Sequence, residues 1–135
     1  LAGRLGASSA VVPLRDLAGD PDPVLRLAAA TALARIPAAA PDDLLAFLGD
    51  AAAAVRRRAV VGLRRRHGLD PERAALLLGD PARAICKLAS AALADSGPAA
   101  RPAALGILRK FGSPARGLAH RAILCWRLRA WLRKH

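Results

Sequence analysis

The chain has 135 residues and a formal net charge of +12 at pH 7, with 22 basic and 10 acidic side chains. Alanine occurs 34 times and leucine 23 times, whereas aromatic residues make up only 3% of the sequence. Helix-favouring residues dominate, and the β-branched and aromatic residues that strands favour are too few for a sandwich or a barrel. The length suits one domain and excludes two ordinary globular domains.

An internal repeat organises the chain. Asp20, Asp50 and Asp80 recur at intervals of 30 residues, each directly after a glycine. Apolar residues then return at positions separated by four and eight, which is the spacing of one helical face. These positions are Leu25, Ala29 and Leu33, then Val55, Ala59 and Leu63, then Ile85, Ala89 and Leu93. A looser fourth copy is expected with a shift of 33, in which Leu118, Ala122 and Trp126 form the face.

A shorter helix is predicted before each turn, at roughly 8–18, 41–49, 71–79 and 98–111. We expect the glycine of each turn to adopt the positive φ of a helix end and the following Asp to cap the next helix. The complete helix pairs cover about 8–36, 41–67, 71–95 and 98–134. The sequence therefore predicts one all-α domain over 1–135, an α-solenoid of about four helix-pair repeats. Because it lacks methionine, we expect it to be trimmed or part of a longer polypeptide.

The segment from Asp20 to Leu33 resembles the second half of a HEAT repeat, of the short type found in phycobilisome-lyase-like proteins. The segment from Asp80 to Leu93 is a second, weaker match. The resemblance covers about residues 9–128 and implies a HEAT/armadillo-like solenoid. HEAT-like repeats generally serve as binding scaffolds, so the resemblance also implies a binding function.

The sequence contains few of the residue patterns that known enzyme classes use for catalysis. Glu72 is the only glutamate and no His-Glu dipeptide occurs, which excludes an iron site of the HEAT-repeat hydroxylase type. Cys86 and Cys125 are far apart, with His120 the only histidine near either, so neither a metal site nor a disulfide is expected. Phosphate-binding glycine loops are also absent from the sequence. We therefore predict no catalytic residue and no cofactor.

A cationic surface is predicted on the second helix of the second repeat. Arg57, Arg58, Arg64 and Arg65 fall on the side opposite Val55, Ala59 and Leu63. We call these four residues the arginine ridge. Second helices usually line the concave surface of a HEAT stack, so Arg26, Arg35 and Lys87 from adjacent repeats are expected to share a groove with the ridge.

The last helix, about 114–134, has apolar residues around almost its whole circumference. Residues 96–135 carry nine basic side chains and no acidic one. Trp and Arg are favoured anchors in protein interfaces, so a partner is expected to cover this helix. The alternatives are further repeats outside this chain and a membrane surface. The candidate interface residues are Trp126, Trp131, Leu132, Arg127 and Arg133. Trp126 also aligns with the core positions Leu33, Leu63 and Leu93. This alignment predicts a structural role for Trp126, as a core or capping residue, in place of a role in an interface.

These patterns favour a non-enzymatic scaffold or adaptor that binds an acidic protein inside a larger assembly. The alternative is a nucleic-acid binder that contacts the phosphate backbone, because four stacked repeats would span about 30–40 Å, close to one turn of B-DNA. A distant third is a HEAT-like alkylpurine DNA glycosylase that uses Trp126, Trp131 and Asp95. The sequence contains no segment of the length that spans a bilayer and no signal peptide, which predicts a cytoplasmic protein.

Overall fold

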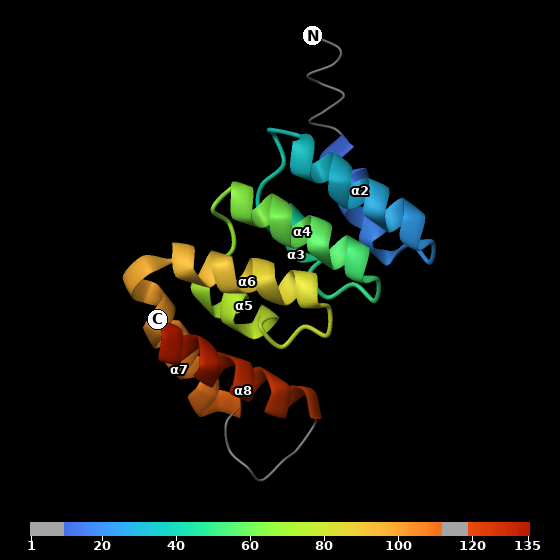
Figure 1. Cartoon of the computed structure of the whole chain (residues 1–135). Coiled ribbons are helices and arrows are strands. Elements are labelled where there is room, and N and C mark those ends of the chain that lie inside the picture. Colours follow the sequence, from blue (N-terminus) through green and yellow to red (C-terminus); the bar gives the residue numbers. More distant parts are fainter. Residues whose placement is uncertain (1–9, 112–118) are drawn as a thin grey trace. The chain divides into compact units, whose positions relative to one another are not determined.

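The computed structural model of the protein describes residues 10–111 and 119–135, with side chains in the last segment from residue 122 onward (Figure 1). Every regular element in these residues is helical, so the predicted all-α class is confirmed. The chain forms two compact units, Leu1–Gly68 and Leu69–His135. The boundary falls between the second and third predicted repeats.

The N-terminal unit contains two helix pairs. Residues 10–16 are helical and continue into the 3₁₀ turn η1 (Leu17–Gly19), which precedes α2 (Pro23–Arg35). The second pair consists of α3 (Asp42–Leu45) and α4 (Ala53–Arg65). Helix α2 packs along α4, and α3 contacts both (Figure 1). The largest fully buried side chains of this unit are those of Leu33, Leu44, Phe47, Val55, Val60 and Leu63.

The first helix of the second pair is shorter than the predicted 41–49. After Leu45 the hydrogen bonds no longer follow the α-helical pattern. The N–H groups of Phe47 and Leu48 donate to carbonyls three residues earlier, at 3.1 Å and 3.2 Å. The segment that follows α3 is therefore a series of turns rather than an α-helix. The side chain of Phe47 is nevertheless completely buried, so these turns still supply a core residue.

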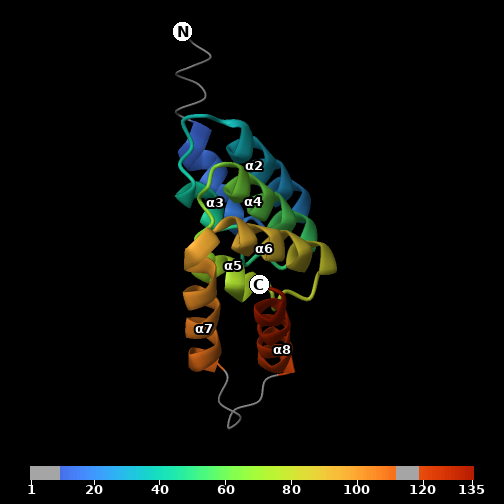
Figure 2. The same ribbon diagram turned by 60° about the vertical axis from the view of Figure 1, so that its left-hand side comes forward.

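The C-terminal unit contains α5 (Pro71–Leu77), α6 (Arg83–Asp95), the 3₁₀ turn η2 (Gly97–Ala99), α7 (Ala100–Phe111) and α8 (Ala119–Lys134). Helix α5 packs against α6 and α7, and α7 packs against α8. Figure 2 shows α7 and α8 side by side and antiparallel. The core of this unit includes Ile85, Ala89 and Leu93 of α6, Ala104 and Ile107 of α7, and Leu128 of α8.

In the three repeated turns, neither the glycine nor the Asp has the predicted role. Asp20, Asp50 and Asp80 do not occupy the N-cap. The carboxylates of Asp50 and Asp80 instead accept a hydrogen bond from the backbone N–H two residues later, at 2.8 Å and 2.7 Å. In the first turn Asp20 does the same for Asp22, which is the true N-cap of α2 and accepts from the Val24 N–H at 2.9 Å. The Asp residues thus fix the turn that precedes each helix.

The glycines of these turns do not take a positive φ. Among the described residues only Gly97 and His67 do so, with φ of 59° and 54°. His67 ends α4 in a Schellman arrangement, because its own N–H and that of Gly68 bond to the carbonyls of Arg64 and Leu63, at 3.2 Å and 2.9 Å. The left-handed position after α4 is therefore filled by a histidine.

The fourth repeat is out of the predicted register. Leu118 lies outside the described residues, and Ala122 and Trp126 are exposed rather than buried. The buried face of α8 is formed by Leu124, Cys125, Leu128 and Trp131. Leu124, Leu128 and Trp131 match Ile85, Ala89 and Ala92 of α6 with a shift of 39 residues, in place of the expected 33. The interpretation of Trp126 as a core residue is therefore wrong.

Candidate interaction surfaces

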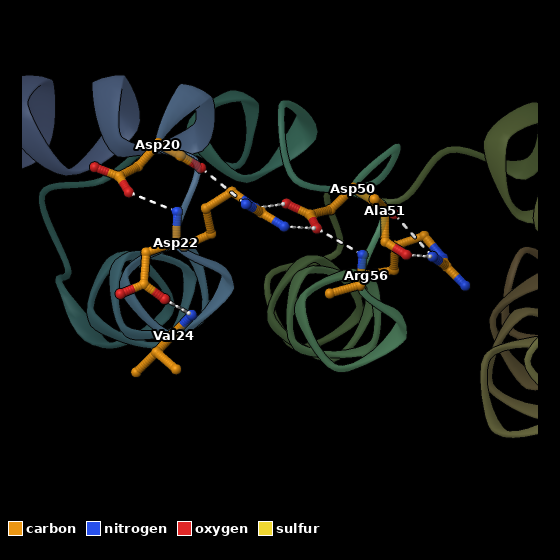
Figure 3. A network of polar contacts seen from close by, with 8 residues as sticks. Asp20, Asp22, Val24, Asp50, Ala51 and Arg56 are labelled. Carbon is orange, nitrogen blue, oxygen red and sulfur yellow. Dashed lines mark hydrogen bonds and ion pairs between the residues drawn. The ribbon is translucent and has the colours of Figure 1, made fainter.

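A polar network joins α2 to the turn before α4. The guanidinium of Arg26 donates through Nε and Nη2 to the carboxylate of Asp50, at 2.7 Å and 3.2 Å, and through Nη1 to the carbonyl of Asp20 at 2.8 Å. The Arg56 Nη1 donates to the carbonyls of Asp50 and Ala51 at 2.8 Å and 3.2 Å. Figure 3 shows this succession of carboxylate and guanidinium groups. The paired donors fix the orientation of the carboxylate of Asp50.

The electrostatics of this network keep Asp50 charged. Burial opposes ionisation of the carboxyl and by itself would raise its pKa. The hydrogen bonds from Arg26 and from the Ala52 N–H, together with the charges of Arg26 and Arg56, outweigh burial and lower the pKa of Asp50 below its ordinary value. The hydrogen bond to Asp50 in turn raises the pKa of Arg26. Arg26, predicted to bind a partner, is instead committed to this internal ion pair.

Two basic triplets, Arg56–Arg58 and Arg64–Arg66, begin and end the cationic part of this region, and two of their members are also used within the fold. Arg56 belongs to the network above. Arg66 directly follows α4, and its guanidinium donates to backbone carbonyls at and beyond the C-terminal end of α2, those of Leu33, Ala34, Ile36 and Ala39. A cation in this position satisfies carbonyls that have no partner inside the helix. Arg56 therefore binds the backbone of the turn before α4, and Arg66 ties the end of α4 to the end of α2.

The four inner members of the triplets form the arginine ridge. Arg57, Arg58 and Arg65 are exposed, and Arg64 is half-buried. Arg57 and Arg64, like Arg58 and Arg65, are seven residues apart, so each pair lies about 10 Å apart along the axis of α4 on the same side. Helix α4 contains no acidic side chain. The ridge therefore concentrates positive charge on one face of the N-terminal unit.

The other predicted polyanion contacts lie on different helices. Arg35 is exposed at the end of α2. Lys87 is exposed on α6 of the C-terminal unit, at the position that corresponds to Arg57 after one repeat of 30 residues. Whether Lys87 shares a groove with the ridge stays a prediction.

The two tryptophans of α8 have opposite environments. Trp126 is 64% exposed, whereas Trp131 is 6% exposed and stacks on the ring of His135, with the ring centroids 4.4 Å apart. The indole Nε1 of Trp131 is buried without a hydrogen-bond partner. Trp131 is therefore part of the core of the C-terminal unit. The prediction that it offers an exposed surface to a partner is wrong.

The remaining candidate interface residues also separate. Arg127 is half-buried, and its Nη1 donates to the carbonyls of Leu78 and Asp80, both at 2.8 Å. It thereby attaches α8 to the turn before α6 and is not free for a partner. Leu132 is half-buried, and Arg133 is exposed. Exposed Ile123 was not among the predicted interface residues, because apolar residues surround the sequence of this helix and do not show which face is exposed.

Comparison with known proteins identifies the architecture. Residues 1–64 match the model of the HEAT repeats family. The chain is a HEAT-like repeat protein. Together with the helical structure, the match shows an all-α fold of the solenoid class. Searches of the curated proteins and of the solved structures gave no significant match.

HEAT repeats are generally protein-interaction scaffolds and typically non-enzymatic. Within residues 10–111 and 119–135 of this HEAT-like repeat protein, no group of three or more His, Cys, Asp or Glu side chains is placed to share a metal ion. No helix in the described part of the chain combines the length and the apolar character needed to cross a membrane.

Proposed function

We propose that this HEAT-like repeat protein is a non-enzymatic scaffold or adaptor whose arginine ridge binds an acidic surface of a protein partner within a larger assembly. The observation that carries the proposal is that the arginines in α4 and directly after it have different contacts. Arg56 and Arg66 bond to backbone carbonyls, whereas Arg57, Arg58 and Arg65 remain exposed on a helix without acids. Exposed like charges on one face repel each other, and an acidic partner relieves that repulsion.

A protein partner accounts for the ridge better than a nucleic acid does. Apart from its arginines, α4 offers only alanine, valine, glycine and leucine, so it has no aromatic ring for base stacking and no amide for reading base edges. The alternative, a phosphate-backbone contact, needs only the positive charge. The two functions differ in their sensitivity to nuclease and to salt.

We further propose a cytoplasmic location. Cys86 and Cys125 are both free thiols, and unpaired cysteines are typical of reducing compartments.

The test is purification of the tagged full chain from its source cells, with and without nuclease and a salt wash, followed by mass spectrometry of the bound material. Wild type is compared with Arg58→Glu/Arg65→Glu, which reverses two exposed charges of the ridge. The matched control is Arg109→Glu/Lys110→Glu, which makes the same charge change at exposed positions in the last turn of α7.

The scaffold predicts a stoichiometric protein that survives nuclease and is lost from the ridge variant but kept by the control. Equal retention by both variants would remove the ridge from the function. Nucleic acid alone, released by salt, would establish the phosphate-backbone alternative.

A further inference from the structure

The outer face of α8 carries a stripe of aromatic, aliphatic and cationic side chains that the fold does not use. Ile123 and Trp126 are 45% and 64% exposed, and Arg129 and Arg133 are exposed beside them. We call these four residues the α8 stripe. At 100° per residue all four fall on the side opposite Leu124, Leu128 and Trp131, which face the core.

We propose that the α8 stripe is a docking site for an acidic peptide segment of a protein partner, one that carries large apolar side chains between its carboxylates. The inference rests on the proposed scaffold function, but it concerns a different surface, in the C-terminal unit. Trp and Arg are the residues most enriched among the anchors of protein interfaces.

Trp126 is placed to act as the anchor. The positions four residues before and four residues after it are Ala122 and Ala130, whose small side chains leave room beside the indole. Removal of an exposed tryptophan ring from water by a partner lowers the free energy and so favours binding. Ile123 extends this apolar area, so the site accepts more than one apolar side chain.

The charge around the stripe selects an acidic partner. Arg129 and Arg133 lie on one flank of Trp126, and exposed Lys134 lies toward the other. Arg101 of α7 adds a cation near the C-terminal end of α8, where its Nη1 lies 3.5 Å from the carbonyl of Leu132. No acidic residue occurs between residues 96 and 135, so nothing in this part of the sequence neutralises these cations. Guanidinium groups bind carboxylates with paired hydrogen bonds.

Two other occupants fit the same surface less well. A second copy of the chain would bring identical cations together, which costs free energy at an interface. A membrane surface takes helices with a broad apolar face, whereas the apolar face of α8 is already buried in the C-terminal unit. Among the side chains that the structure describes on α8, from residue 122 onward, Ile123 and Trp126 are the large apolar ones left exposed, which is a small area for insertion into a membrane.

The experiment selects short random peptides by display against the full chain and measures the affinity of the selected peptides for four variants. Trp126→Ala removes the anchor, and Trp126→Phe restores an aromatic ring. Arg129→Glu/Arg133→Glu reverses the flanking charge. Arg58→Glu/Arg65→Glu alters only the ridge. Melting temperatures establish that each variant is folded, which is expected because all the substituted side chains are exposed.

The expected peptides are enriched in Asp and Glu and in large apolar residues. Their affinity should fall at least about tenfold in Trp126→Ala and in the charge-reversed stripe, with partial recovery in Trp126→Phe. The ridge variant should bind them as wild type does, so loss of the scaffold partner in that variant and loss of peptide binding are separate results. Trp126 fluorescence should shift to the blue when peptide binds, since the indole leaves water.

Three results would overturn the proposal. The first is a selected pool with no enrichment of acids, and the second is equal affinity for wild type and Trp126→Ala. The third is binding to vesicles of phosphatidylcholine and phosphatidylserine that depends on Trp126 while no peptide does, which would assign the stripe to a lipid surface.

Discussion

At the scale of single residues, the carboxylate of Asp50 joins the two helix pairs of the N-terminal unit. Its side chain is 5% exposed and that of its partner Arg26 is 14% exposed, whereas both side chains of the Asp70–Arg73 pair are more than 40% exposed. Ion pairs at exposed positions contribute little to stability. The Arg26–Asp50 and Asp70–Arg73 ion pairs, one shielded and one exposed, therefore provide a matched comparison within one chain.

Asp50→Asn should lower the melting temperature at neutral pH. The melting temperature of the variant should also fall less steeply than that of wild type as the solution is made acidic. The pKa of Asp50 is lower in the folded chain than its ordinary value, so the folded state binds this proton more weakly than the unfolded state does. The stabilisation is complete above about pH 4 and is lost as the pH falls through the folded pKa. Thermal unfolding from pH 7 to pH 2 measures the effect.

The control for this prediction is Asp70→Asn, which removes the carboxylate of the exposed pair. Its melting curve should follow that of wild type closely across the same pH range. Equal loss of stability in both variants would mean that Asp50 contributes no more than a surface charge.

At the scale of elements, two glycines within helices differ in what surrounds them. A Cβ atom on Gly62 of α4 would lie 2.9 Å from Cδ1 of Leu44 and 3.1 Å from Cβ of Ala34. A Cβ atom on Gly106 of α7 would meet nothing within 4 Å. The close approach of α4 to its neighbours therefore needs a glycine at position 62, whereas α7 has no such need.

Gly106→Ala should raise the free energy of unfolding by about 0.5–1 kcal/mol, because alanine is the better helix former. Gly62→Ala gains the same propensity but must displace buried atoms, which costs about 1–3 kcal/mol. We therefore expect a net loss of stability of about 1 kcal/mol for Gly62→Ala. Chemical denaturation of both variants measures the opposite signs, and stabilisation by both would contradict the close packing of α4.

The two tryptophans of α8 provide the second comparison at this scale. Trp131→Ala should destabilise the chain by about 3–5 kcal/mol, because it removes a large buried side chain and its stacking on His135. Trp126→Ala should change stability by no more than about 0.5 kcal/mol, since Trp126 is largely exposed. Urea denaturation followed by circular dichroism measures both. A similar loss in the two variants would contradict the register of α8.

At the scale of the whole molecule, the net charge of +12 opposes folding through repulsion among the cations. Added salt screens this repulsion, with a screening length of about 10 Å at 0.1 M. The melting temperature should therefore rise by a few degrees between low salt and 0.15 M salt. The variant Arg58→Glu/Arg65→Glu carries less net charge and should gain less. A melting temperature that falls with salt would show that attractive ion pairs outweigh the repulsion.

Much of the fold could be predicted from the sequence because its signals are local. The apolar residues that follow each Asp at mutual separations of four and eight positions located α2, α4 and α6, and a proline or an acidic residue in the first turn located α5. The same periodicity separated the arginine ridge from the buried face of α4. Helical angle depends on sequence separation alone, so this division required no knowledge of neighbouring helices.

Tertiary structure decided what each side chain of the patterned faces contacts. Arg26 and Arg127 look like surface cations in the sequence, yet each bonds to groups 24 or more residues away along the chain. The register of α8 was also beyond the sequence, because apolar residues surround that helix and several faces fit equally well. Packing against α7 and the turn at Gly79, whose Cβ would lie 3.0 Å from Cβ of Leu124, selected the face that buries Trp131 and leaves Trp126 exposed.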